Sequence, residues 1–101
     1  MTRSELIAQL SERFEHLLQR DVRVSVQCIT DAIAEALAAG ERVEIRGFGS
    51  FVVNTRPPRM GRNPRTGEAV AIPEQRLPHF KPGKELRDAV QGLRAIDPHQ
   101  P

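Results

Sequence analysis

The first forty residues place apolar side chains at the spacing of amphipathic helices. Thr2 and Glu5 form the Thr-x-x-Glu capping box that opens a helix. A first apolar stripe comprises Leu6, Ile7, Leu10, Phe14, Leu17 and Leu18, and a second comprises Val22, Val26, Ile29, Ile33 and Leu37. Gly40 then suits the position just past a helix C-terminus. The pattern predicts two helices, with the boundary between them at residues 16–21.

Alternation of period two follows the second helix and predicts strands. In the first strand Val43 and Ile45 would face a core while the charged residues face water, and Phe48 and Phe51 accompany the second strand. The predicted strands are Arg42 to Arg46, Gly47 to Val53 (entered through a tight turn) and Arg76 to Lys81.

A final helix is predicted from Gly83 to about Leu93, with three apolar residues facing inward, namely Leu86, Val90 and Leu93. Residues 95–101 have no such pattern and are predicted to form a disordered tail. The sequence therefore predicts an α+β fold with one domain over residues 1–94.

Residues 54–75 differ from everything around them and predict an arm. Residues 54–73 hold four prolines, four arginines and almost no large apolar side chains, so they cannot form core (Pro57, Pro58, Pro64, Pro73; Arg56, Arg59, Arg62, Arg65). Two extended limbs of about eight or nine residues, at about 3.3 Å each, would reach roughly 28 Å from the body.

Charge is divided unevenly along the chain. Residues 1–40 carry four arginines against six acidic residues, a balance of −2, whereas residues 52–84 carry seven basic groups against two acidic ones, a balance of +5. This asymmetry points to a polyanion bound by the second half of the chain. A solvated charged surface is the alternative reading.

The predicted body without the arm is only about 75 residues, a size at which a single core is marginal. The one cysteine, Cys28, excludes an internal disulfide and fits a reducing compartment. Pairing of two subunits is therefore expected to supply the missing buried area. The second helical stripe and the phenylalanines are the candidate interface.

Other classes of protein fit the sequence poorly. The start of the chain has no signal-peptide pattern, and no apolar run approaches the roughly 20 residues of a membrane span, so we expect an intracellular protein with no membrane partner. His16, His79 and His99 show no metal-ligand spacing, and Gly83-Lys84 lacks the frame of a phosphate loop. We expect no enzyme activity, no small-molecule substrate, no cofactor and no metal.

The arm tip carries the candidate chemistry. Arg62 and Arg65 flank Pro64, and guanidinium groups can meet phosphates or enter a minor groove about 6 Å wide. A rigid apolar proline ring can wedge between base pairs, although an ordinary turn proline is equally consistent with composition. RNA or single-strand binding is a rival, but the arm has no aromatic residue on which bases could stack. A pure dimerisation module would leave the arm unexplained.

Three stretches together resemble the bacterial HU and integration host factor family: GERVEIRGFGSF (Gly40 to Phe51), RPPRMGRNPRTGE (Arg56 to Glu68) and LPHFKPGKELRD (Leu77 to Asp88). With MTRSELI at the start, the resemblance is strongest to the β-subunit branch of integration host factor and covers about residues 1–90. It implies an intertwined dimer with a two-helix hairpin, a three-stranded antiparallel sheet with a long β-ribbon arm, and a C-terminal helix.

The resemblance also implies a function, that of an architectural protein that binds the minor groove of double-stranded DNA and bends it sharply, a class of which this family is itself a standard example. The partner would be an integration host factor α subunit, or a second copy of the chain. The setting would be the cytoplasmic nucleoid, in recombination and in transcriptional and translational control. An HU-like nonspecific homodimer is the alternative.

Roles follow by position. The resemblance implies that Pro64 intercalates and that the arm contacts DNA, with contacts expected at Arg56, Arg59, Arg62, Asn63, Arg65 and Thr66. Glu44 and Arg46, two apart on a strand, would share a face and read sequence, the carboxylate orienting the guanidinium, unless they form only an exposed ion pair. Phosphate contacts are expected at the body's flanks, although some of these residues could merely cap helices: Arg3, Ser4, Arg76, His79, Lys81, Gly83 and Lys84.

Overall fold

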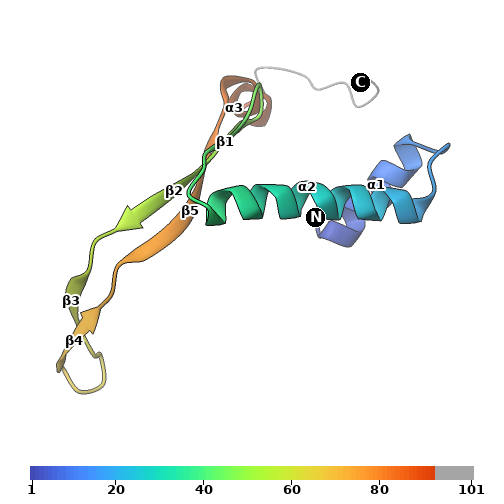
Figure 1. Cartoon of the computed structure of the whole chain (residues 1–101). Coiled ribbons are helices and arrows are strands. Elements are labelled where there is room, and N and C mark those ends of the chain that lie inside the picture. Colours follow the sequence, from blue (N-terminus) through green and yellow to red (C-terminus); the bar gives the residue numbers. More distant parts are fainter. Residues whose placement is uncertain (93–101) are drawn as a thin grey trace.

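The computed structural model describes residues 1–92, and the predicted tail and Leu93 lie outside them. A helical pair forms one end, a sheet crosses the end of the longer helix, and an arm projects away from both (Figure 1). The elements are α1 (Arg3–Arg13), α2 (Gln19–Ala38), β1 (Val43–Ile45), β2 (Gly49–Arg56), β3 (Arg59–Arg62), β4 (Ala69–Ile72), β5 (Gln75–Pro82) and α3 (Lys84–Val90). The predicted α+β class is confirmed.

The start of α1 and the position of the helix boundary agree with the sequence pattern. The hydroxyl of Thr2 accepts a hydrogen bond from the Glu5 backbone N–H at 3.2 Å, which caps α1 as the capping box predicts. The boundary falls in the expected window, because α2 begins at Gln19.

The predicted extent of the first apolar stripe is wrong, because α1 ends at Arg13. Phe14, Leu17 and Leu18 lie in the connecting turn with exposed fractions of 44%, 44% and 59%. The Leu17 N–H bonds to the Phe14 carbonyl at 2.9 Å, so the backbone has already left the helix there. Helical spacing continued through this turn without a Gly or Pro to mark it.

The C-terminus of α2 closes with the glycine motif that the sequence predicts. Gly40 has a φ of 82°, its N–H bonds to the Leu37 carbonyl at 3.0 Å, and the Glu41 N–H bonds to the Ala36 carbonyl at 2.9 Å. This pair of bonds is a Schellman motif, which needs a left-handed residue at Gly40. It turns the chain from α2 into the sheet.

The sheet is antiparallel with the order β1-β2-β5. Strand β1 is shorter than predicted, since Arg46 lies in the turn, and Ile45 is 39% exposed and faces no core. Strands β2 and β5 are longer than predicted and pair from Gly49 and Pro82 out to Arg56 and Gln75. The sheet therefore carries the chain well into the arm.

The predicted continuous ribbon is divided in two. Strands β3 and β4 form a separate two-stranded sheet beyond Pro57-Pro58 on one limb and Pro73-Glu74 on the other. A proline has no backbone N–H and cannot continue a ladder of hydrogen bonds. The prolines therefore separate the outer hairpin from the body's sheet.

Helix α3 lies at the end of the sheet away from the arm (Figure 1). It ends at Val90, earlier than predicted, and Gly92 follows with a φ of 79°. The expectation that Val90 faces inward is wrong within this chain, because its side chain is 79% exposed. The described part of the chain provides nothing that covers it.

The core of the chain is small for its length. Among residues 1–92 only Ile7, Val22 and Val26 are buried hydrophobic residues, with Leu10 packed against them. The radius of gyration is 19.3 Å, against about 13 Å for a compact chain of this size. None of the described helices is long and apolar enough to span a membrane. Many large apolar side chains of the described residues are therefore exposed to solvent in the single chain.

Candidate nucleic-acid interface

The tip of the arm is a turn that holds Pro64 outward. The Asn63 N–H donates to the Glu68 carbonyl at 2.9 Å, and the Gly67 N–H donates to the Asn63 carbonyl at 2.8 Å. The side-chain oxygen of Asn63 accepts from the Arg65 N–H at 2.8 Å, so this bond spans the proline. Gly67 has a φ of 73°, which suits glycine. Pro64 itself is exposed, at the end of a closed hydrogen-bonded frame.

Two predicted contact residues are engaged within this tip. The side-chain oxygens of Asn63 and Thr66 accept backbone hydrogen bonds from Arg65 at 2.8 Å and Glu68 at 3.3 Å. The Asn63 bond closes an Asx turn and the Thr66 bond an ST turn, and turns of both kinds fix the local backbone. Both residues therefore shape the loop that presents the ring, a role that the sequence reading had not distinguished from contact with DNA.

The cationic side chains of the arm are distributed over both faces of the outer hairpin. Arg59 pairs with Ile72 and Arg62 with Ala69 in the register of β3 and β4. Because strand side chains alternate, Arg59 and Arg62 project to opposite faces. Arg62 also reaches the Gly67 carbonyl, with Nη1 at 3.4 Å, while Arg65 is exposed at the tip. The outer hairpin can thus meet a polyanion on either side.

The root of the arm separates the remaining predicted contacts into two sets. Residues opposite each other in β2 and β5 share a face, so Arg56, His79 and Lys81 lie on one face and Arg76 on the other. The guanidinium of Arg76 donates from Nη2 to the Ala38 carbonyl at 3.4 Å. The structure does not bring Arg76 together with the other three.

The flanks of the body show specific partners for two predicted phosphate contacts. Arg3 Nη1 donates to the side-chain oxygen of Gln27 at 2.8 Å, and Gln27 Nε2 donates to Asp31 at 2.7 Å. Lys84 Nζ lies 3.3 Å from Asp88 Oδ2, while Ser4 is exposed near the start of α1. The chain through Gln27 was missed because a polar residue on a helix surface carries no distinctive signal.

The expected anion cradle at Gly83 is not available in full. The Gly83 N–H donates to the Phe48 carbonyl at 2.8 Å, and an added Cβ would come within 3.3 Å of that oxygen. This N–H therefore holds the start of α3 to the β1–β2 turn. The phosphate contact expected at Gly83 stays a prediction, and in this structure the Gly83 N–H itself is already engaged.

The structure places Glu44 beside an arginine other than Arg46, and sequence readout by Glu44 and Arg46 stays a prediction. Glu44 Oε2 lies 3.8 Å from Nη2 of Arg42, which also donates to the Ser50 hydroxyl at 3.2 Å. Arg46 lies beyond the end of β1, in the turn. Both arginines are two residues from Glu44, so the spacing could not decide between them, and the exposed pair contributes little stability.

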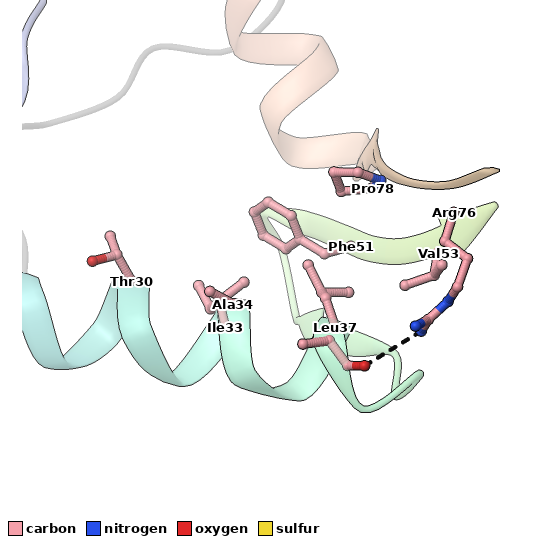
Figure 2. Close-up of a pocket in the computed structure, with 9 residues that line it drawn as sticks. Thr30, Ile33, Ala34, Leu37, Phe51, Val53, Arg76 and Pro78 are labelled. Carbon is pink, nitrogen blue, oxygen red and sulfur yellow. Dashed lines mark hydrogen bonds between the residues drawn. The ribbon is translucent and has the colours of Figure 1, made fainter. Parts of the chain in front are cut away.

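An apolar groove of about 570 Å³ lies between α2 and the sheet (Figure 2). Ile33 and Leu37 of α2 face Phe51 and Val53 of β2, with Pro78 beside them. Phe80 packs between Phe48 and Phe51, with ring centroids 5.4 Å and 4.8 Å apart. The groove brings Ile33 and Leu37 of the second helical stripe together with Phe51, and pairing of two subunits there stays a prediction.

Taken together, an arginine-bearing hairpin arm, a framed exposed proline and an incomplete core define a DNA-binding architectural protein. A sequence profile described as "Bacterial DNA-binding protein" matches residues 1–91. The chain belongs to this family.

Relatives and solved structures agree with this assignment. An integration host factor subunit beta of Herminiimonas arsenicoxydans is 57% identical over 93 residues, covering 92% of each chain. A subunit of the same name from Burkholderia cenocepacia is 55% identical over 103 residues, covering 97% of this chain and 96% of its own. The Anabaena HU–DNA cocrystal structure superimposes with a TM-score of 0.81 at 34% identity, covering 89% of this chain and 97% of that one.

Proposed function

We propose that the chain is a β-type subunit of an integration host factor, which binds the minor groove of double-stranded DNA and bends it without catalysis. The observation that carries the proposal is the tip, where a closed frame of hydrogen bonds presents the Pro64 ring between Arg62 and Arg65. Because these hydrogen bonds fix the backbone of the tip, the orientation of the ring is set before it contacts a base step. Inserting it would unstack that step and kink the duplex.

The arginines of the arm would supply the attraction that holds the hairpin on DNA. Arg56, Arg59, Arg62 and Arg65 lie along the hairpin on both of its faces, so phosphates of both strands bordering a groove can be contacted. Lys81 and His79 share the outer face of the sheet with Arg56 and extend the positive surface toward the body. Contacts of this type position the protein and make its affinity depend strongly on salt.

A second subunit would complete the body. The groove lined by Ile33, Leu37, Phe51 and Val53 is apolar and open. Within residues 1–92 only three hydrophobic residues are buried, which is too small a core to stabilise a chain of this length. Relatives named as a beta subunit imply an alpha subunit as the occupant, and a second copy of the chain is the other candidate. The complex would act at the nucleoid, in recombination and in control of transcription and translation.

A second candidate function is favoured by one observation. Glu44 pairs with Arg42, so the carboxylate expected to orient Arg46 as a reader of sequence lies beside a different arginine. The solved structure with a TM-score of 0.81 is an HU–DNA complex. An HU-like homodimer that binds DNA without sequence preference fits both facts.

A bending measurement tests both functions. A short duplex with a fluorophore at each end is titrated with the chain alone and then with an integration host factor α subunit, and the end-to-end distance is followed. The proposal predicts strong shortening once the right partner is present, and an affinity that falls by roughly 0.9 log units per log unit of salt for each phosphate neutralised. Shortening with the chain alone on any sequence selects the HU-like alternative, and a straight duplex in every mixture contradicts both.

A further inference from the structure

The C-terminus of α2 has no cation of its own and receives one from the sheet. The last turn of α2 contains no basic residue. The Schellman motif engages the carbonyls of Ala36 and Leu37, but the Ala38 carbonyl is reached by the Arg76 guanidinium, at 3.4 Å. A positive charge is favourable there, because the helix C-terminus carries a partial negative charge.

The site around this guanidinium is shaped by the turn that follows the helix. A Cβ added to Gly40 would lie 3.7 Å from Nη2 of Arg76, so the guanidinium lies directly against the turn. Figure 2 shows the side chain reaching from the sheet across the end of the groove to the carbonyl oxygen. The contact joins residues 38 apart in sequence.

Arg76 lies near the end of β5 from which the arm projects, so its contact with α2 acts at the root of the arm. Arg76 pairs with Thr55, one register position before the paired ends of β2 and β5 at Arg56 and Gln75. Apolar side chains line the groove between α2 and the sheet, and attraction between such side chains is non-directional. A hydrogen bond at the root has a direction, and can therefore fix the angle at which the ribbon leaves the body.

We propose that Arg76 is a positioning residue that ties the root of the arm to the C-terminus of α2, and is not a phosphate contact. It lies on the face of the sheet opposite to Arg56, His79 and Lys81, which are the side chains placed to meet DNA. The consequence for bending rests on the function proposed above. The tie itself is a property of the free protein.

The first experiment separates a positioning role from a phosphate contact. Affinity for one duplex is measured over a range of salt for the wild type, Arg76→Gln and Arg59→Gln, each with the same partner subunit. Arg59→Gln, on the outer hairpin, is expected to lower the slope by about 0.9, as for one lost phosphate contact. Arg76→Gln is expected to weaken binding about two- to fivefold with the slope unchanged. A slope lowered by Arg76→Gln as much as by Arg59→Gln overturns the proposal.

The second experiment needs no DNA. Spin labels on Cys28, which is exposed on α2, and on an Asn54→Cys replacement, exposed on β2, report the direction of the sheet relative to the helix. The labelled full-length chain is diluted into unlabelled chain so that distances within one subunit dominate. Arg76→Gln is expected to broaden the distance distribution, and Arg76→Lys, which keeps a cation beside the carbonyl, to restore its width. An unchanged width in Arg76→Gln overturns the proposal.

The two experiments also separate this proposal from the proposed function. If the wild type leaves DNA straight, the function fails while the label distances still test the tie. If Arg76→Gln does not fold, Arg76→Met, which removes the charge and keeps an unbranched chain beside the apolar groove, takes its place in both experiments. A broadened distribution or a lowered affinity at unchanged slope then supports the tie, and a phosphate-sized loss of slope contradicts it.

Discussion

Replacing Pro64 by alanine tests the wedge with little change to the loop around it. Asn63 supplies three hydrogen bonds to the tip, through its N–H, its carbonyl and its side chain, and none of them uses Pro64. The replacement removes two ring methylenes, each contributing about 0.8 kcal/mol when buried against bases, so about 1.6 kcal/mol is lost per arm. This corresponds to roughly fifteenfold weaker binding.

The assay compares two duplexes of equal length. On an intact duplex, Pro64→Ala is expected to lower affinity by the amount above and to give a straighter complex in the end-to-end distance measurement. On a duplex with a two-nucleotide bulge at each expected kink, no stacked step has to be opened and the joint bends by itself. There the bend should persist in the variant, with a loss of affinity within about threefold. Pro73→Ala, the same chemical change at the base of the outer hairpin, serves as the control.

One result would refute the reasoning. If Pro64→Ala bends the intact duplex as sharply as the wild type and binds it equally well, the ring does not open a base step. Pro64 would then be an ordinary turn proline, and the bend would have to arise from the charges of the arm and the body alone.

Three further predictions concern the tip, the sheet and the groove. Asn63→Ala should reduce bending because it removes the hydrogen bond that spans Pro64, whereas Asn63→Asp keeps the acceptor oxygen and should still bend DNA at saturation. If Asn63→Ala bends DNA as sharply as the wild type, the side chain of Asn63 does not hold the proline in place. Gly49→Ala should lower the free energy of unfolding by about 1–3 kcal/mol and the melting temperature by several degrees, because the added Cβ would lie 2.5 Å from the Lys81 carbonyl oxygen. The exposed control Asn54→Ala should leave the melting temperature unchanged. Ile33→Asp should dissociate the dimer in sedimentation experiments, and an unchanged sedimentation coefficient would exclude the groove as the interface.

The sequence predicted an element correctly wherever a single residue type restricts the local backbone to few conformations. Thr2 caps α1, Gly40 ends α2 and the prolines mark out the arm, because caps, left-handed turns and missing N–H groups act over a few residues. Periodicity failed at Phe14, Leu17 and Leu18, since apolar spacing continues through a turn that no breaker marks. The prolines did not reveal by spacing alone that the ribbon divides into two sheets.

The sequence by itself determined the α+β class, the charged arm with Pro64 at its tip and the small size of the core, because these follow from composition and from local chemistry. Tertiary structure alone decided which partner each polar group takes. Glu44 could reach Arg42 or Arg46 equally well by spacing, and Arg76 finds the Ala38 carbonyl across 38 residues of sequence. Contacts between distant segments depend on the register of the strands and on the direction in which a helix ends. The pattern of neighbouring residues in the sequence specifies neither of these.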